Sequence, residues 1–359
     1  MHLLVDISAH GYGHLGQTAP VLNALGAAVP NLEITVRCGL TEDRLKRRID
    51  VPFRHVHAAT DFGYVMHSAI DLDLPATARR YREMHADWDG RVAAESAWLE
   101  AQGFDAVLTN VSYLPLAGAA RAGIPAAAMS SLNWLDLFVD SFGGQAWAAP
   151  VHAQMSDAYD SARMFLRVTP GLPMESLGNV EPIGPVCRMS RANRAAIARA
   201  LGAEPREKWL LVAMGGMAFP LDVGRWPKLA GVRYFVPPAL AVARADVTAF
   251  DSETIDFSEL LASSDLVVTK PGYGTFVEAA CHGRPVLYVE REGWSEARYL
   301  GEWLRANARA APLERGDLAN GNLMPSVERL LEQPPPAVVP RPTGIADAVR
   351  LLAPLLGGD

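Results

Sequence analysis

A glycine-rich loop near the start of the sequence is the first feature that could do chemistry. It reads HGYGHLG after a short apolar run, so Gly11, Gly13 and Gly16 form a G-x-G-x-x-G pattern. Glycines let the backbone turn sharply and bring a ligand close to the amides at a helix N-terminus. A dinucleotide-binding dehydrogenase also needs an acidic residue at the end of the second strand to hold the ribose. Here that strand ends at Cys38, so the loop favours another kind of phosphate-handling enzyme.

His14 is the residue of this loop that could move a proton. Imidazole is the usual proton acceptor near neutral pH, and a histidine at this turn would point toward a cleft beyond the strand ends. Alternatively, His14 only caps the helix or bonds a neighbouring carbonyl. The residue type and its position leave both interpretations open.

A second glycine-rich turn lies in the last third of the sequence, within TKPGYGTFVEAACHG. It places Gly272, Gly274 and Thr275 where a predicted strand passes into a helix, and helix amides and the helix dipole suit a diphosphate there. Glu278 follows about one turn later and could accept hydrogen bonds from a ribose diol. Lys270, at the strand end, supplies a cation beside the phosphates. The pattern predicts a nucleoside-diphosphate site.

This second turn resembles the donor-binding segment of the GT-B glycosyltransferases. In the nucleotide-sugar transferases of secondary metabolism the segment begins His-Gly-Gly, whereas the peptidoglycan-precursor N-acetylglucosaminyl transferases begin it with a basic residue and Ser-Gly. Lys270-Pro271 is closer to the second pattern. The sequence is also similar to the glycosyltransferase-like N-terminal region of L-arabinokinases, whose GYGT…EA and R-x-x-x-x-E runs match Gly272 to Glu296. That resemblance covers most of residues 1–310, through AHGYGH, NWLDLF and VAMGG.

The resemblance implies a role for each residue of the two loops. His14 would be the general base of an inverting transfer, taking a proton from the acceptor hydroxyl. The amides of the second turn and Lys270 would stabilise the leaving diphosphate without a metal ion. The other implied roles are Gly11 and Gly13 beside acceptor and diphosphate, Gly215 and Gly216 near the phosphates, Gly272, Gly274 and Thr275 on the diphosphate, Glu278 on the ribose and Glu292 on the sugar hydroxyls. No cofactor is expected, and a UDP-sugar is the first donor to test.

A polar loop of the N-terminal half could bind the acceptor. Residues 61–74 mix Asp61 and His67 with aromatic side chains, in the half where this architecture places acceptor specificity, but the loop could equally be a solvated connection. Asp136 interrupts an apolar stretch and either faces out from the core or contacts the acceptor. The acceptor itself stays unidentified. If it is a lipid, we expect peripheral contact with a membrane surface.

Alternating strand and helix patterns must position these loops. They predict βαβ units and a mainly parallel sheet, first over about 180 residues and again after a Gly- and Pro-rich break at 178–188. We therefore expect an α/β protein of GT-B architecture, with two Rossmann-like doubly wound domains facing across a cleft. The predicted domains are 1–185 for the acceptor, 186–340 for the nucleotide sugar, and 341–359 for a C-terminal helix that packs back on the N-terminal domain.

The bulk composition excludes several other classes of protein. The sequence has 359 residues, of which 50% are hydrophobic, enough for two buried cores. A formal net charge of −7 disfavours a nucleic-acid partner. The three cysteines form no CxxC pair, which indicates reduced thiols and no metal site. Because the first strand begins at the second residue and no apolar run approaches the roughly 20 residues of a membrane span, we expect a cytoplasmic protein without a signal peptide.

Two other functions are compatible with the same scaffold. The GGM at 215–217 and the strand predicted at 232 are close together in sequence, which is short for a crossover helix and puts some donor contacts in doubt. One alternative is therefore a catalytically silent sugar-nucleotide-binding or regulatory protein. The other is a sugar-nucleotide 2-epimerase, although that chemistry needs further carboxylates around the cleft.

Overall fold

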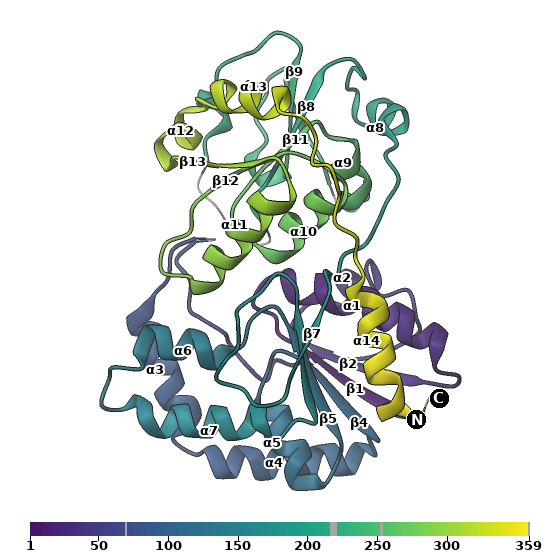
Figure 1. Cartoon of the computed structure of the whole chain (residues 1–359), viewed down its shortest axis with the longest axis vertical. Helices are drawn as coiled ribbons and strands as arrows, with labels where there is room; N and C mark the ends of the chain where they lie inside the picture. The colour runs from purple at the N-terminus through teal and green to yellow at the C-terminus, as the bar shows by residue number, and fades with distance from the viewer. Residues whose placement is uncertain (69, 216–220, 252–253, 358–359) are drawn as a thin grey trace.

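Two parallel sheets, each covered by helices, make up the protein. The structure is a computed structural model that describes residues 1–68, 70–215, 221–251 and 254–357. Figure 1 shows the two halves one above the other, with the C-terminal helix beside the lower, N-terminal half. Of the helices described, none is both long enough and apolar enough to cross a membrane.

The first sheet has seven strands in the order β3-β2-β1-β4-β5-β6-β7, and every pairing is parallel. The central strands β1 and β4 are buried almost throughout, as expected for a sheet covered on both faces. The strands are β1 (His2–Ile7), β2 (Glu33–Cys38), β3 (Arg54–Val56), β4 (Ala106–Asn110), β5 (Ala126–Ser130), β6 (Met164–Val168) and β7 (Val180–Ile183).

Seven helices of the N-terminal half cover this sheet. Two of them follow another helix, and the others come after strands, so that several helix N-termini lie at the edge of the sheet that holds the carboxyl ends of the strands. The helices are α1 (Gly13–Ala28), α2 (Glu42–Lys46), α3 (Leu74–His85), α4 (Trp88–Gln102), α5 (Leu114–Ala122), α6 (Trp134–Phe142) and α7 (Ala148–Asp160).

The second sheet has six strands, again all parallel, in the order β10-β9-β8-β11-β12-β13. Its strands are β8 (Lys208–Ala213), β9 (Val232–Val236), β10 (Val247–Ala249), β11 (Leu266–Thr269), β12 (Val286–Val289) and β13 (Ala310–Leu313). The surrounding helices are α8 (Arg194–Leu201), α9 (Phe257–Ser263), α10 (Tyr273–Cys281), α11 (Ser295–Asn307), α12 (Arg315–Asn320) and α13 (Met324–Glu332), with short 3₁₀ turns η1 (Val223–Arg225) and η2 (Pro238–Leu240). Between β8 and β9, the described residues 221–231 contain only the short turn η1, so this part of the crossover carries no α-helix.

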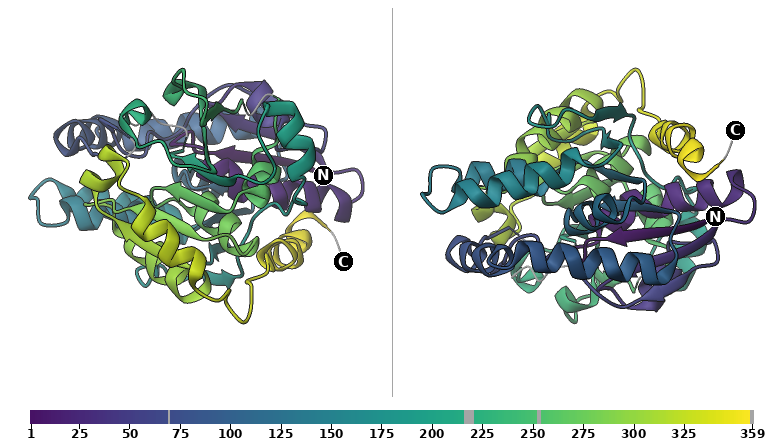
Figure 2. Two further views of the ribbon diagram at one scale, coloured as in Figure 1. Left: turned by 90° about the horizontal axis from the view of Figure 1, so that it is seen from above. Right: turned by 90° about the horizontal axis from the view of Figure 1, so that it is seen from below.

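The chain passes between the halves twice, and the two crossings are tied together. After α13 it returns to α14 (Gly344–Leu352), which contacts α1 and β7 and ends in the turn η3 (Ala353–Leu356). Figure 2 shows α14 lying beside the N-terminal half in both further views. The amide of Gly344 donates to the carbonyl of Pro185 (3.0 Å), and that of Gly184 donates to Asp347 (3.1 Å). A Cβ at Gly344 would lie 2.0 Å from the Gly184 oxygen, so this approach requires glycine.

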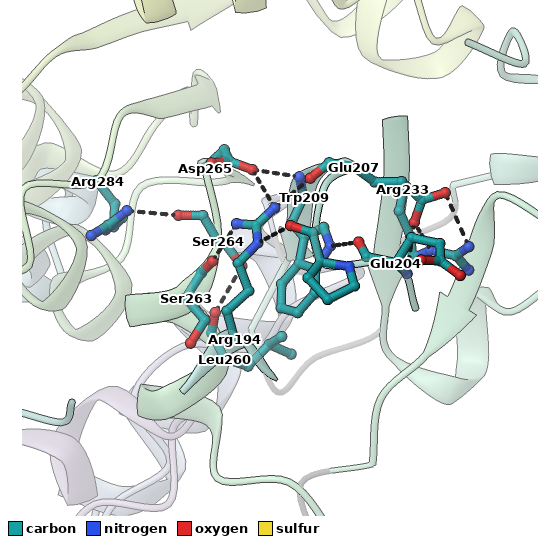
Figure 3. Close-up of polar contacts among 11 residues, drawn as sticks. Arg194, Glu204, Glu207, Trp209, Arg233, Leu260, Ser263, Ser264, Asp265 and Arg284 are labelled. Atoms are coloured by element: carbon teal, nitrogen blue, oxygen red, sulfur yellow. Dashed lines mark hydrogen bonds and ion pairs between the residues drawn. The ribbon is translucent and has the colours of Figure 1, made fainter. Parts of the chain in front are cut away.

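Arg194 attaches α8 to the second sheet. Its guanidinium donates to the carbonyls of Pro205 (2.9 Å) and Ser263 (2.8 Å) and to the carboxylate of Asp265 (2.9 Å). It also lies over the Trp209 ring, 4.2 Å from the ring centroid. Figure 3 shows these donors directed into one compact cluster. This cluster stabilises the end of the second sheet opposite the glycine turns, since it surrounds the starts of β8 and β11.

Candidate active site

Both glycine-rich loops lie where the strand order of their own sheet reverses. In the first sheet β1 lies between β2 and β4, so the loop before α1 adjoins Asn110 at the end of β4. In the second sheet β8 lies between β9 and β11, so Gly215 adjoins Lys270 after β11. Such reversal points open a crevice beyond the carboxyl ends of the strands, where doubly wound proteins bind ligands. The two candidate loops therefore occupy equivalent places in the two halves.

His14 is buried in the first turn of α1, and its hydrogen bonds assign its tautomer. Its Nδ1 lies 2.8 Å from Oδ1 of Asn110. The Asn110 amide nitrogen donates to Oε1 of Gln17 (3.2 Å) and to the His14 carbonyl (3.5 Å), so the oxygen of this amide faces the ring. Nδ1 must then carry the proton, which leaves Nε2 as an acceptor. His14 is thus prepared to take a proton at Nε2.

The partner of His14 is a neutral amide rather than a carboxylate. Burial lowers the pKa of His14 to about 4, and the hydrogen bond that His14 donates to Asn110 opposes this only in part. The imidazole is therefore neutral at pH 7, the form that a general base needs. An amide, however, gives little electrostatic stabilisation to the imidazolium that forms when the base accepts a proton.

Beyond Asn110 the hydrogen bonds continue into the second half of the molecule. Gln17 Nε2 donates to Ser131 Oγ (2.7 Å), and Ser131 Oγ donates to Oε1 of Glu296 (2.6 Å). The other carboxylate oxygen of Glu296 accepts from Nε1 of Trp294 (3.1 Å). Glu296 lies in the first turn of α11 and is buried, which raises the pKa of its carboxyl. Side chains from α1, β4, the end of β5 and α11 therefore form one chain across the two halves.

Aromatic rings close the space beside this chain. The His10 ring stacks on Trp294 of the second half (5.7 Å between centroids, 10° between planes) and meets the edge of Trp134 at 5.3 Å. Its Nε2 lies 3.1 Å from the carbonyl of Tyr64. Burial and the nearby His14 lower the pKa of His10 to about 3. His10 thus serves as a neutral packing group between the halves.

A cavity of about 580 Å³ opens on the N-terminal side of these rings. Its lining includes His10, Gly11, Asp61 and Tyr64, so it brings together two of the residues that the sequence predicts near the acceptor. Asp61 accepts hydrogen bonds from Ser8 Oγ (3.0 Å) and from the indole of Trp134 (2.7 Å). Burial raises the pKa of Asp61 to about 6, and the nearby Asp6 adds to this shift. The cavity therefore combines an aromatic lining with one poorly solvated carboxyl.

On the opposite side, the N-terminus of α10 presents backbone donors that have no partner within the helix. Gly272 occupies the cap position without a side-chain cap bond, and Gly274 and Thr275 are partly exposed in the first turn. The first amides of a helix have no partner within the helix. The Lys270 ammonium lies beside both glycine turns, since a Cβ would be 3.3 Å away at Gly272 and 3.7 Å away at Gly215. Burial lowers the pKa of Lys270 to about 8, and the nearby Arg291 adds to this shift.

Glycine at position 215 is required by the backbone, which has a φ of +83° there. Gly216, predicted beside it, lies outside the described residues. Gly11 likewise has a φ of +92°, while Gly13 is the first residue of α1. These positions let the two turns keep open space for a ligand.

Glu278 is buried, whereas Gly274 and Thr275 in the first turn of the same helix are partly exposed. Burial raises the pKa of its carboxyl, and Oε1 has no hydrogen-bond partner in the part of the chain that the structure describes. Ser258 and Arg48 of the N-terminal half are its polar neighbours, and Arg48 reaches Ser258 at 3.4 Å. An unpartnered buried carboxylate oxygen is costly, so this side chain has capacity for a further donor.

Several predicted residues do not line the cavity beside Asp61, namely Gly13, His14, His67, Asp136 and Glu292. Glu292 is exposed in the turn before α11. His67 is exposed and lies 3.6 Å from the carboxylate of Asp73. Asp136 accepts from Ser176 Oγ (2.5 Å) and from Asn133 (2.9 Å), so it stabilises the turn at the start of α6. Among the described residues, none gather as a cluster of three or more metal-ligating side chains.

Sequence reasoning missed the residues that complete the surroundings of His14. Asn110, Gln17 and Ser131 belong to no motif that predicts a site. Glu296 did carry a signal, because it closes the R-x-x-x-x-E run that begins at Arg291. The carboxylate that joins the two halves is therefore the second of two glutamates in one segment, and not Glu292.

Comparisons with known proteins give the fold. No protein-family model matches the chain. The crystal structure of CalG4, the calicheamicin glycosyltransferase, aligns with a TM-score of 0.62 at 17% identity, over 99% of this chain and 98% of that one. A UDP-glucosyltransferase from Polygonum tinctorium aligns with a TM-score of 0.60 at 15% identity, over 100% and 99%. The chain has the GT-B fold. The predicted fold class and the resemblance to the GT-B glycosyltransferases are thereby confirmed.

A sequence relative covers the same two halves of the GT-B fold. L-arabinokinase of Arabidopsis thaliana is 23% identical over 340 residues, which make up 92% of this chain and 32% of that protein. The chain thus spans about a third of the length of this relative. The match agrees with the similarity noted from the GYGT…EA and R-x-x-x-x-E runs.

Proposed function

We propose that the protein is a glycosyltransferase that moves a sugar from a nucleoside-diphosphate donor to an acceptor hydroxyl. The observation that carries the proposal is the placement of His14 and Lys270 at the reversal points of their sheets in a GT-B fold. His14 presents an unprotonated Nε2, and Lys270 lies beside the first amides of α10, which have no partner within the helix. A proton acceptor and an anion site are the two parts that such a transfer needs.

The donor is assigned to the second half. The amides of Gly272, Gly274 and Thr275 and the ammonium of Lys270 would bind a diphosphate, with Gly215 on its other side. Gly216, which the sequence also predicts there, lies outside the described residues. The free oxygen of Glu278 would accept from a ribose hydroxyl. Glu292 would contact the sugar hydroxyls. A UDP-sugar is the first donor to test, since the Polygonum tinctorium structure is that of a UDP-glucosyltransferase.

Transfer would proceed as one displacement with inversion. The acceptor oxygen attacks the anomeric carbon while its proton passes to Nε2 of His14, and the bond from that carbon to the diphosphate oxygen breaks. The Nδ1–H group of His14 remains hydrogen-bonded to Oδ1 of Asn110 throughout the transfer. The negative charge on the leaving diphosphate develops beside Lys270 and the positive end of α10, so no metal ion takes part in this scheme.

The acceptor is assigned to the cavity of the N-terminal half. Asp61 and Gly11 line it, Gly13 follows in α1, and the loop that carries His67 and the turn at Asp136 would contribute outer contacts. In this scheme residues 1–185 bind the acceptor, 186–340 bind the donor, and 341–359 fasten the C-terminus to the N-terminal domain. Peripheral contact with a membrane for a lipid acceptor, and a cytoplasmic location, stay predictions from the sequence.

Substitution of His14 tests the proposal. Binding of UDP, dTDP, GDP and ADP is measured first by thermal shift, since a ligand of the native state raises the melting temperature. Release of the diphosphate from the matching sugar donors is then followed with a panel of hydroxyl acceptors. We expect His14→Ala to keep nucleotide binding and to lose about 10²- to 10⁴-fold in turnover. His152→Ala, which removes an exposed histidine on α7, should change neither.

A catalytically silent sugar-nucleotide-binding protein is the second candidate. The neutral partner of His14 and its pKa of about 4 favour it, because both weaken a base. This candidate expects nucleotide binding without turnover on any acceptor, and no functional change in His14→Ala. Absence of binding by every diphosphate would contradict both functions.

A further inference from the structure

The hydrogen bonds that begin at His14 all run in one direction. Nδ1–H donates to Asn110, the Asn110 amide to Gln17, the Gln17 amide to Ser131 and the Ser131 hydroxyl to Glu296. Each amide also makes a second, longer contact in the same direction. The Gln17 oxygen also accepts from the backbone amide of Ser131 (3.3 Å), and the Asn110 nitrogen also donates to the His14 carbonyl (3.5 Å). The proton positions along the chain are therefore mutually dependent.

Glu296 is the group that fixes this direction from the far end. A carboxylate can only accept, so the Ser131 hydroxyl must donate to it, and its oxygen must then accept from Gln17. No cation within 4.0 Å pairs with Glu296 in the described part of the chain, although Arg291 and Lys270 act on it from farther away. Its two oxygens are instead engaged by Ser131 and the Trp294 indole. These two neutral donors hold the buried carboxylate at the end of the hydrogen-bonded chain without an ion pair.

We propose that Glu296 is a positioning residue for His14, which holds the imidazole in its Nδ1-protonated tautomer through Ser131, Gln17 and Asn110. The proposal rests on the proposed function only for its kinetic part. Glu296 belongs to α11 of the second half. His14 therefore adopts the Nδ1-protonated tautomer when the second half is docked on the N-terminal half. The far carboxylate also supplies, through polarised neutral groups, part of the negative charge that Asn110 lacks.

The tautomer of His14 is the first readout. The ¹⁵N chemical shifts of the ring nitrogens distinguish Nδ1–H from Nε2–H and need no substrate. Wild-type protein should show Nδ1–H. Ser131→Ala, which cuts the chain without removing a charge, and Glu296→Ala should both shift His14 toward the other tautomer. Glu302→Ala is the matched control, since Glu302 lies on the same helix and forms an exposed pair with Arg298.

Turnover is the second readout. Ser131→Ala should lower kcat about 10-fold or more, a part of the 10²- to 10⁴-fold that a positioned base contributes, with little change in donor affinity. The double variant Ser131→Ala/Glu296→Ala should lose no more than either single variant, because both cut the same chain. A merely structural role would instead give additive losses and unchanged ring shifts.

Substitution of Asn110 separates positioning from any direct role of Glu296. A carboxylate accepts from Nδ1–H in either orientation, so Asn110→Asp should restore the tautomer and kcat in the Glu296→Ala background. Wild-type ring shifts in both Ser131→Ala and Glu296→Ala, or failure of Asn110→Asp to restore them, would overturn the proposal. If no acceptor supports turnover in wild-type protein, the transferase proposal fails, while the ring shifts still decide the role of Glu296.

Discussion

Two buried polar clusters that begin in the N-terminal half satisfy their polar groups in opposite ways. Arg37 on β2 lies between Asp6 on β1 (2.5 Å) and Glu95 on α4 (2.5 and 3.1 Å), so ionised groups satisfy one another. The chain from His14 through Asn110 consists of neutral groups for most of its length. Both clusters are more than nine-tenths buried at their centres. Within the described part of the chain, the side-chain hydrogen bond of the His14 ring uses Nδ1, and Nε2 is the nitrogen left to accept a proton.

The difference separates a structural cluster from a functional one. All three nitrogens of the Arg37 guanidinium donate to the two carboxylates, and the guanidinium also lies 4.4 Å from the Trp98 ring centroid, so the cluster holds β1, β2 and α4 together. At His14 the partner fixes the neutral ring but does not compensate the positive charge that the ring gains when it accepts a proton. Such incomplete compensation costs stability, and it is typical of sites that must bind or move a proton.

The largest effect is expected where charges are paired. Arg37→Met should lower the free energy of unfolding by about 3–5 kcal/mol, because Asp6 and Glu95 would remain buried without a counter-charge. Urea denaturation measures this change. Arg298→Ala, which breaks an exposed pair with Glu302, should cost no more than about 0.5 kcal/mol. Equal losses in the two variants would show that the Arg37 cluster is not a buried ion cluster in energetic terms.

Asn110→Asp would place a carboxylate beside the His14 ring, as Asp6 and Glu95 lie beside Arg37 in the other cluster. A carboxylate next to the ring should raise the pKa of His14 by about 1–3 units from its low value near 4. The base is active when neutral, so the acid limb of the pH–turnover profile should move up by the same amount, while turnover at pH 8 rises about tenfold as the imidazolium gains a counter-charge.

The pH dependence of protein stability independently tests the direction of the His14 pKa shift. In the native protein the pKa of His14 lies below the value of about 6.5 in the unfolded chain, so stability should fall as the pH drops from 6.5 toward 4. Asn110→Asp should reduce that fall. An unchanged acid limb and an unchanged pH–stability curve would mean that residue 110 does not control the charge of His14.

Sequence reasoning reached the architecture because the alternation of strands and helices depends on local pattern. It also placed His14 and both glycine turns, since glycines before a helix constrain the backbone over a few residues. Edge strands were harder to see. β7 reads VEPI and lies inside the Gly- and Pro-rich break, and β13 reads AAPL, because a strand that pairs on one side only tolerates proline.

The rest of the site depends on long-range geometry. Asn110 is 96 residues from His14, and only the neighbouring positions of β1 and β4 bring them together. Glu292 and Glu296 lie in one short segment, and the start of α11 decides between them. Gly293 turns with a φ of +69°, so Glu292 stays exposed while Glu296 enters the buried face of the helix. Neither distinction is visible in residue types or spacing.

The smallest effect is predicted in the second half, where Lys270 lies in the proposed donor site. Lys270 is a cation without a carboxylate within ion-pair distance among the described residues, unlike Arg37, and its pKa of about 8 reflects burial first and the nearby Arg291 second. A bound diphosphate would supply the missing negative charge. Lys270→Met should therefore weaken nucleoside-diphosphate binding about tenfold, as expected for one charge-assisted hydrogen bond.

The pH dependence of diphosphate binding shows whether Lys270 contributes through its positive charge or only through the shape of the site. Below pH 8 Lys270 is protonated, so affinity should be constant from pH 7 upward until the pH approaches 8, and it should then fall as the ammonium loses its proton. Calorimetric titration with UDP between pH 7 and 9.5 measures this. Lys270→Met should remove the fall, whereas Lys208→Met, at an exposed position at the start of β8, should retain it. If the fall persists without Lys270, another group binds the diphosphate, and the unpaired cation of the second half has a structural role like that of Arg37.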